Sequence, residues 1–227
     1  LGERETVADV ARNLARVVDM IVARTFRHTV LVELAAQSKI PVINGLTDLH
    51  HPCQVLADLF TLVEHRRKLD EIKVAFIGDG NNLVHSWMEA AVLYPFTFAV
   101  ACPKGYEPNT GLVAECQARG AKIEVTTSVA DAVRSADVLY TDVWTSMGQE
   151  EETAVRRDVF SGYQINDEVL RHAAKDALVM HCLPAHRGEE ITDAVLEGRQ
   201  SIIFDQAENR LHLQKALMAW LARENSK

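Results

Sequence analysis

Short apolar runs alternate with amphipathic helical segments along most of the chain, and this alternation constrains the fold more than any other feature of the sequence. The run "IKVAFIG" at 72–78 stands between a charged stretch and the turn "DGNN", which is typical of a strand buried on both faces. A helical spacing follows it, and the pair of patterns recurs to about residue 205. Such alternation predicts crossover units and a parallel sheet with helices on both sides.

The two periodicities place each expected element. We expect strands at 20–26, 40–45, 72–78, 96–103, 122–127, 137–143, 177–182 and 201–206. We expect helices at 6–21, 29–38, 52–67, 83–94, 111–120, 129–136, 166–174 and 209–225. The predicted class is α/β, with two doubly wound parallel-sheet domains, the first incomplete in this sequence because it offers only two clear strands. The expected domains cover 1–65 and 66–205, and a C-terminal helix over 206–227 returns toward the first.

Charge and cysteine content argue against several classes of protein. Among 227 residues, 24 lysines and arginines stand against 32 aspartates and glutamates, and a net charge of -8 disfavours broad binding to nucleic acid. The four cysteines show neither a C-x-x-C pair nor zinc-ligand spacing, so we expect no disulfide framework and no metal. No apolar run reaches the ~18 residues of a membrane span and the first residues lack a signal-peptide layout, so we expect a cytoplasmic protein without membrane contact.

Polar loops follow the expected strands at the edge where a parallel sheet binds its ligands. That edge is formed by the carboxyl ends of the strands, near the point where strand order reverses. The loops read "ART", "NGLTDLHHPCQ", "GDGNN", "DVWTSMGQE", "HCLPAHRGEE" and "DQAENR". We therefore expect their side chains to gather around one site.

Two of these loops suit small charged groups. "GDGNN" can hold an anion at a helix start, but it is not G-x-G-x-x-G, so no dinucleotide cofactor is expected. Asn81 and Asn82 fit helix caps at least as well as ligands. Asp142 and Ser146 are separated by a short turn that suits an ammonium group beside a carboxylate, although Asp142 fits a helix cap equally well.

The other loops supply many hydrogen-bond donors and few bases. His51 and Gln54 lie three residues apart on one helix face, where both reach one small polar group, and a solvated capping loop fits them equally. Arg24 ends a strand, and its guanidinium suits an oxyanion, while Arg210 suits a phosphate, a carboxylate or plain solvent. The sequence shows no nucleophile elbow, H-E-x-x-H motif or Walker A loop. This set predicts catalysis by positioning and charge stabilisation, without cofactor or metal.

The order of these loops resembles a known enzyme family. "HPCQ", "GDGNN", "DVWTSMGQE", "HCLPAHRGEE" and "AENR" closely resemble the loops of the ornithine carbamoyltransferases, and the likeness extends along essentially the whole chain. "HCLP" and "SMG" distinguish them from the related aspartate carbamoyltransferases. The resemblance implies two α/β domains, the substrates carbamoyl phosphate and L-ornithine, the products L-citrulline and phosphate, a homotrimer or multiple of trimers, and arginine biosynthesis.

The resemblance also implies roles for individual residues. Carbamoyl phosphate would contact Arg24, His51, Gln54 and Arg210. The amino-acid end of ornithine would contact Asn82, Asp142, Ser146 and Met147. Cys182 and Leu183 would lie beside the reacting amine, with Cys182 as the usual proton acceptor and the departing phosphate as the other candidate base. Arg24, His51 and Gln54 would stabilise the oxyanion on the carbonyl oxygen.

One motif of the family does not appear in this sequence. The S-x-R-T phosphate loop is missing, because Leu1 corresponds to a position well inside the first domain, and "VART" at 22–25 corresponds to a later strand end. The missing loop fits two interpretations: the sequence is a fragment of a complete enzyme, or the polypeptide has impaired catalysis. Two other functions stay open: a carbamoyltransferase for another amine or amino acid, such as acetylornithine or putrescine, and a non-catalytic ligand-binding relative.

Overall fold

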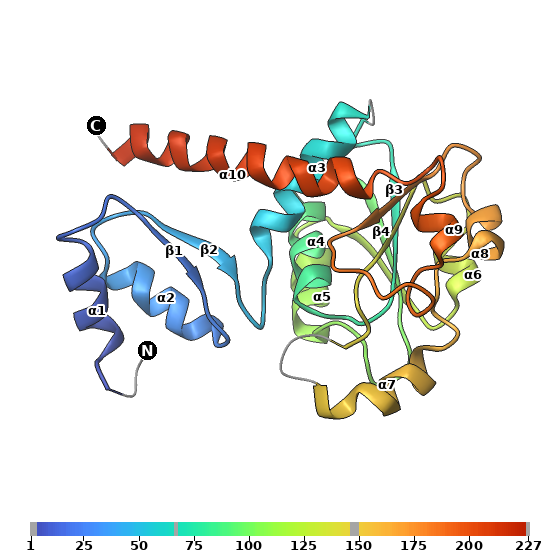
Figure 1. The fold of residues 1–227 in the computed structure, drawn as a ribbon, viewed down its shortest axis with the longest axis horizontal. Coiled ribbons are helices and arrows are strands. Elements are labelled where there is room, and N and C mark those ends of the chain that lie inside the picture. The colour runs from blue at the N-terminus through green and yellow to red at the C-terminus, as the bar shows by residue number, and fades with distance from the viewer. Residues whose placement is uncertain (1–3, 66–67, 146–149, 226–227) are drawn as a thin grey trace.

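The computed structural model describes residues 4–65, 68–145 and 150–225, and its elements form a smaller and a larger α/β part (Figure 1). The smaller part holds a two-stranded sheet and the larger part a five-stranded sheet, and every strand pairs in parallel. Within the described ranges no helix is long and apolar enough to cross a membrane. The α/β class predicted from the alternating pattern is confirmed.

The smaller part packs two helices against two strands. Its elements are α1 (Val7–Leu14), β1 (Ile21–Arg24), α2 (His28–Gln37) and β2 (Val42–Leu46). Its core consists of Val7, Ala11, Ile21, Ala23, Leu31 and Leu34. Because side chains alternate along a strand, Val22 and Arg24 point away from this core and are exposed.

The larger part is a five-stranded sheet with helices on both faces. Its strands are β3 (Lys73–Ile77), β4 (Thr97–Ala101), β5 (Lys122–Thr126), β6 (Val138–Thr141) and β7 (Leu178–His181). Its shorter helices are α4 (Asn82–Leu93), α5 (Thr110–Ala118), α6 (Val129–Val133), the 3-10 helix η1 (Glu150–Glu152), α7 (Thr153–Phe160), α8 (Asp167–His172) and α9 (Asp193–Leu196). The spatial order of the strands is β5-β4-β3-β6-β7.

The central strand β3 shows why this sheet forms where the sequence predicts it. Val74 and Phe76 enter the core that also contains Trp87 of α4, while Ala75 and Ile77 enter the core on the opposite face. These four side chains are fully buried. A strand covered on both faces needs apolar residues at every position, which is why a continuous apolar run predicted it.

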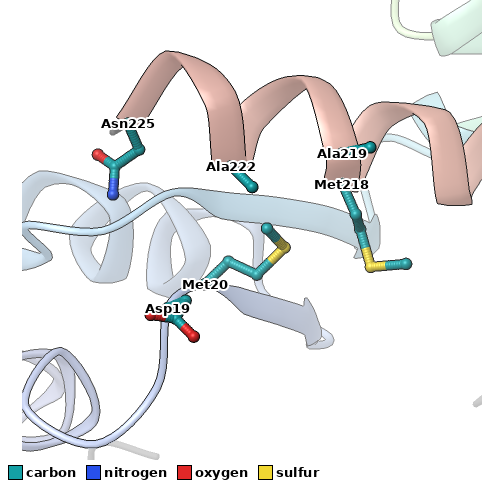
Figure 2. A pocket seen from close by; sticks show the side chains of 6 residues that line it. All are labelled: Asp19, Met20, Met218, Ala219, Ala222 and Asn225. Carbon is teal, nitrogen blue, oxygen red and sulfur yellow. The ribbon is translucent and has the colours of Figure 1, made fainter. Parts of the chain in front are cut away.

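Two helices connect the parts. Helix α3 (Pro52–Glu64) carries proline at its first position, where no backbone donor is lost. Helix α10 (Ile203–Asn225) starts beside β7 and runs along α3 until its C-terminal end lies over the smaller part (Figure 1). Figure 2 shows Met20 directed toward this end of α10, where Met218 and Ala222 line the same hollow.

The sequence prediction is wrong at several elements. The strand expected at 201–206 does not form, because Ser201 makes a single bridge with Val179 and α10 begins at Ile203. Three adjacent apolar residues fit the first turn of a buried helix as well as a strand. Helix α1 ends at Leu14, and Val17 in the expected continuation is 71% exposed. Helices α7 and α9 were not expected, because both are short and polar at their starts.

Candidate active site

The order of the larger sheet reverses at its centre. From β3, the strands β4 and β5 follow on one side, and β6 and β7 follow on the other. Ligands of such sheets bind where the connections leave in opposite directions, at the carboxyl ends of the strands. The loop 78–82 follows β3, Asp142 follows β6 and Cys182 follows β7. The fold therefore collects three of the predicted loops at one edge.

Asp142 joins the loops of three neighbouring strands. Asn81 caps α4 by accepting bonds from the backbone N–H groups of Leu83 and Val84, and its Nδ2 donates to Oδ2 of Asp142 at 3.1 Å. The Cys182 thiol donates to the other oxygen, Oδ1, at 3.0 Å. Oδ1 also accepts from the backbone N–H of Val143 at 2.8 Å, and Asp142 remains half-buried at the tip of the sheet.

The Cys182 thiol is held in its neutral form. Burial, followed by the negative charge of Asp142, raises the pKa of Cys182 well above its usual range. A neutral thiol that already donates to a carboxylate does not accept a proton unless it first loses its own. At neutral pH, Cys182 is therefore a hydrogen-bond donor.

The loop after β7 is fixed from beneath by a buried glutamate. His181 Nδ1 accepts from the backbone N–H of Leu183 at 2.8 Å, which leaves the proton on Nε2 for Glu190 Oε1 at 3.1 Å. The same oxygen accepts from the backbone N–H of His186 at 2.5 Å. Leu183 has φ of 58°, a strained conformation for a residue other than glycine. These bonds hold Cys182 and Leu183 at the strand tip in spite of that strain.

His51 is a neutral side chain surrounded by charges. It precedes the first turn of α3, and its backbone N–H donates to Ser86 Oγ on α4 at 2.7 Å. Burial, and then the positive charge of Arg210, lowers the pKa of His51 to about 4; Asp142 opposes this shift and Arg24 adds to it. Among the described residues, the buried Nδ1 has no hydrogen-bond partner. A neutral imidazole at this place can donate to a ligand without carrying charge.

Gln54 follows His51 by one helical turn and is fully buried. Its Nε2 donates to Oδ1 of Asp58 at 2.8 Å. Its Oε1 is buried without a hydrogen-bond partner in the described part of the chain. The free atom of Gln54 is therefore an acceptor, whereas the sequence analysis expected a donor to the carbonyl oxygen.

Arg24 and Arg210 bring positive charge to the site from the smaller part and from α10. Arg24 ends β1 and is exposed, while Arg210 is half-buried one turn after Gln206. Across residues 4–65, 68–145 and 150–225, neither guanidinium forms a hydrogen bond or an ion pair. Both charges act on His51. Two unpaired guanidinium groups near one neutral donor suit a small anion.

Four predicted site residues remain to be placed. Asn82, the first residue of α4, donates from Nδ2 to the backbone oxygen of Thr47 at 2.6 Å, so it ties the loop after β2 to the larger part. Leu183 lies beside Cys182 at the tip of β7. Ser146 and Met147 lie outside the described residues.

The interactions of the buried Asp58 and Arg156 were not predicted from the sequence. Asp58 is fully buried and bonds Gln54, and the spacing of four in "QVLAD" was the signal for that pair. Arg156 of α7 is 5% exposed and donates to Asp79 Oδ2 at 3.0 Å and to the backbone oxygen of Trp144 at 2.9 Å. That pair links residues 77 positions apart, and no local pattern predicts it.

Potential metal ligands occur at the same edge, but their donor atoms are engaged. Asp142, His181 and Cys182 bring one candidate ligand atom each within 4.8 Å of one another. Both ring nitrogens of His181 already have partners, and the Cys182 thiol is neutral, whereas a metal requires the thiolate. The chemistry of this donor set therefore favours hydrogen bonding over metal ligation.

Comparisons with known proteins identify the family. A family model described as "Aspartate/ornithine carbamoyltransferase, carbamoyl-P binding domain" matches residues 1–64, and one described as "Aspartate/ornithine carbamoyltransferase, Asp/Orn binding domain" matches residues 70–221. A protein of Syntrophus aciditrophicus named ornithine carbamoyltransferase is 54% identical over 223 residues, which cover 96% of this chain and 72% of that protein.

Solved structures share the fold. The ornithine carbamoyltransferase from Pyrococcus furiosus matches with a TM-score of 0.91 at 47% identity, covering 96% of this chain and 71% of that chain. The anabolic ornithine carbamoyltransferase from Campylobacter jejuni matches with a TM-score of 0.93 at 39% identity, covering 99% and 76%. With two family models matching in sequence order and relatives above half identity, this chain belongs to the aspartate/ornithine carbamoyltransferase family.

Proposed function

We propose that the protein transfers the carbamoyl group of carbamoyl phosphate to the δ-amine of L-ornithine, giving L-citrulline and phosphate. The observation that carries this proposal is the setting of His51. One neutral imidazole experiences the charges of Arg24, Arg210 and Asp142, which come from both parts of the molecule and from α10. An anion-binding side with Arg24 and Arg210 and an ammonium-binding side with Asp142 therefore both act electrostatically on His51.

The cationic side suits carbamoyl phosphate. Arg24 and Arg210 offer guanidinium groups without partners among the described residues, and His51 offers a neutral ring nitrogen. As negative charge develops on the carbonyl oxygen, Arg24 and His51 stabilise it, and each such donor contributes about 3 kcal/mol in comparable sites. Gln54 presents an acceptor to the amino group of the same carbamoyl unit.

The anionic side suits ornithine. Asp142 supplies a carboxylate for an ammonium group, and Cys182 and Leu183 flank the place where the δ-amine approaches. Asn82, Ser146 and Met147 complete the set of ornithine contacts in this proposal, on the basis of family resemblance. The amine has a lysine-like pKa of about 10.4, so the site must favour its neutral form for attack.

The reaction proceeds by addition and elimination. The δ-ammonium first loses a proton to bulk water, and the lone pair of its nitrogen then forms a C–N bond with the carbonyl carbon while the C=O electron pair moves to oxygen. The carbonyl re-forms as the C–O bond to phosphate breaks, and the departing phosphate takes one of the two protons on the attacking nitrogen. Because the Cys182 thiol is neutral, we assign it to orienting the amine and Asp142, with phosphate as the proton acceptor.

We also propose a homotrimer that acts in arginine biosynthesis in the cytoplasm. The smaller part exposes Val22, Phe26 and Val32 by 59%, 72% and 54%, and association would cover this apolar surface. All four cysteines are free thiols, as is usual in a reducing compartment. Sedimentation equilibrium of the purified protein measures the assembly, and a monomer at all concentrations would contradict the trimer.

An amine panel tests the proposed reaction. The protein is incubated with carbamoyl phosphate and L-ornithine, N-acetylornithine or putrescine, and the ureido products are quantified. We expect product with L-ornithine alone. Faster product formation with another amine would assign a different carbamoyltransferase, and binding of carbamoyl phosphate without any product would assign a non-catalytic relative.

A further inference from the structure

A buried carboxylate lies directly behind the proposed carbamoyl site. Asp58 of α3 is fully buried, and no lysine, arginine or histidine forms an ion pair with it in the described part of the chain. Its bonds come from neutral donors: Gln54 Nε2 at 2.8 Å, Gln206 Nε2 at 2.7 Å and Tyr140 OH at 3.0 Å. A carboxylate without an ion-pair partner costs stability in a core, and burial raises the pKa of Asp58 to about 7, although the three hydrogen bonds and the charge of Arg210 oppose this shift.

The bonds of Asp58 connect three of the elements near the site, α3, β6 and α10. Tyr140 belongs to β6 and Gln206 to α10, and Gln206 Nε2 also donates to the Tyr140 hydroxyl at 2.8 Å. Gln206 Oε1 accepts from the backbone N–H of His181 at 2.9 Å, one residue before Cys182. Because Oε1 of Gln206 accepts this bond, the opposite end of the amide, Nε2, faces Asp58. Nε2 only donates, so Oδ1 of Asp58 must act as an acceptor.

Asp58 thereby fixes the orientation of the Gln54 amide. An amide side chain presents a donor at one end and an acceptor at the other, and the two ends have nearly the same shape. Because Oδ1 of Asp58 already acts as an acceptor toward Gln206, it selects the orientation in which Nε2 of Gln54 faces Asp58. The opposite end, Oε1, is then the atom that stays buried without a partner among the described residues.

We propose that Asp58 is a positioning residue that makes the site select a carbamoyl group over an acyl group of the same shape, by holding Gln54 Oε1 toward the substrate as a hydrogen-bond acceptor. The proposal rests on the proposed function. Carbamoyl phosphate carries an NH2 group where acetyl phosphate carries a methyl group. The NH2 group satisfies Gln54 Oε1, whereas the methyl group leaves this buried oxygen unpaired, which lowers affinity.

The test compares the affinities of the protein for carbamoyl phosphate and acetyl phosphate by calorimetry. We define the ratio as the dissociation constant of acetyl phosphate divided by that of carbamoyl phosphate. Changes at the phosphate end cancel in this ratio, and a role of Asp58 in stability alone leaves the ratio unchanged. We expect Asp58→Leu to lower the ratio about tenfold to a hundredfold, the range for losing one buried hydrogen bond. Asp58→Asn should keep the ratio, because its Oδ1 must face Gln206 Nε2 and therefore also faces Gln54.

Tyr140→Phe is the matched control. It removes the bond to the other oxygen of Asp58 and the bond from Gln206 Nε2 to the hydroxyl, and it leaves the bond between Asp58 and Gln54 in place, so the ratio should not change. Gln54→Leu should lower the ratio as much as Asp58→Leu does, and the double variant should lower it no further. Gln54→Leu also provides the measurement if Asp58→Leu does not fold, because it retains Asp58 with its other two donors.

Three results would overturn the proposal: an unchanged ratio in Asp58→Leu or Gln54→Leu, equal losses in Asp58→Asn and Asp58→Leu, or additive losses in the double variant. These measurements need binding only. A protein that makes no citrulline but shows the predicted ratios refutes the proposed reaction and supports the role of Asp58. Citrulline formation combined with unchanged ratios refutes only the role of Asp58.

Discussion

The two sides of the site differ in how their charged groups are held. On the amine side, Asp142 accepts from Asn81 and Cys182, so its position is set by the tips of three strands before any ligand binds. On the anion side, neither Arg24 nor Arg210 has a hydrogen bond to a described residue. An arginine side chain carries about 2 kcal/mol of rotamer entropy, so ordering these groups falls to the ligand. One side is preorganised by the protein and the other is organised by the anion.

The scaffold beneath each side explains the difference. Asp142 and Cys182 leave a five-stranded sheet whose central strand is buried on both faces. Arg24 leaves a two-stranded sheet with a register shift between Ala23 and Arg24. Two strands form a marginal sheet, whereas five strands with helices on both sides fix their ends. Substitutions should therefore affect the two sides in different ways.

The largest effect is expected from removing the guanidinium of Arg24. Arg24→Ala should lower the turnover number about a hundredfold to a thousandfold, because a donor to the developing oxyanion is lost. Citrulline formation at saturating substrates measures it. Arg16→Ala removes an exposed arginine of the same part and serves as the control, with unchanged turnover expected. Wild-type turnover in Arg24→Ala would show that the anion side does not act in catalysis.

The next effect concerns folding stability and pH at His51. Its pKa is about 4 in the folded protein and 6.5 in the unfolded chain, so the unfolded chain binds more protons between these values. The free energy of unfolding should then decrease as the pH falls from 6.5 to 4, by up to about 3 kcal/mol. Urea unfolding at several pH values, compared between wild type and His51→Gln, isolates this contribution. The exposed His172→Gln should follow wild type, and a His51→Gln curve parallel to wild type would contradict the prediction.

A smaller effect is expected on the preorganised amine side. Asp142→Asn should raise the KM for ornithine about thirtyfold, within the range for a hydrogen bond to a charged group. The dissociation constant of carbamoyl phosphate, measured without ornithine, should stay the same and serves as the internal control. Equal weakening of both substrates would mean that the two sides are not separate.

The smallest effect is expected at the thiol. If Cys182 only orients the amine, Cys182→Ala should lower turnover about tenfold or less, whereas loss of a general base costs about a hundredfold to ten-thousandfold. Alkylation by iodoacetamide, followed by mass spectrometry, should be slow at Cys182 and faster in Asp142→Asn, because the neighbouring charge that raises the thiol pKa is gone. A loss of a thousandfold in Cys182→Ala would return the role of proton acceptor to the thiol.

The sequence predicted the larger sheet because its strands are apolar at consecutive positions. The run at 72–78 became β3 with all of Val74, Ala75, Phe76 and Ile77 buried. At 201–206, three apolar residues were assigned to a strand, yet only tertiary packing against β7 decides that Ile203 starts a helix. Periodicity therefore identifies long buried runs and fails where a short apolar run fits the first turn of a helix as well as a strand.

The sequence predicted the sheet edge at which the site lies better than it predicted the hydrogen bonds between the site residues. The rule for parallel sheets brought Asp142 and Cys182 to one edge, and the structure joins them at 3.0 Å although 40 residues separate them. The orientation of Gln54 was not predictable, because it depends on Asp58, whose other partners Tyr140 and Gln206 lie 82 and 148 residues away. Side-chain periodicity carries no information about such distant donors.

The path of α10 has a consequence for how the chain tolerates insertions. Gln206 is fastened to Asp58 and to the end of β7, and Arg210 follows it by about one helical turn. One extra residue between these two positions would rotate the guanidinium by about 100° around the helix axis, away from His51. The same extra residue after Trp220, which is 52% exposed near the far end, would leave that angle untouched. The number of residues between Gln206 and Arg210 thus sets the direction in which the Arg210 guanidinium points from α10.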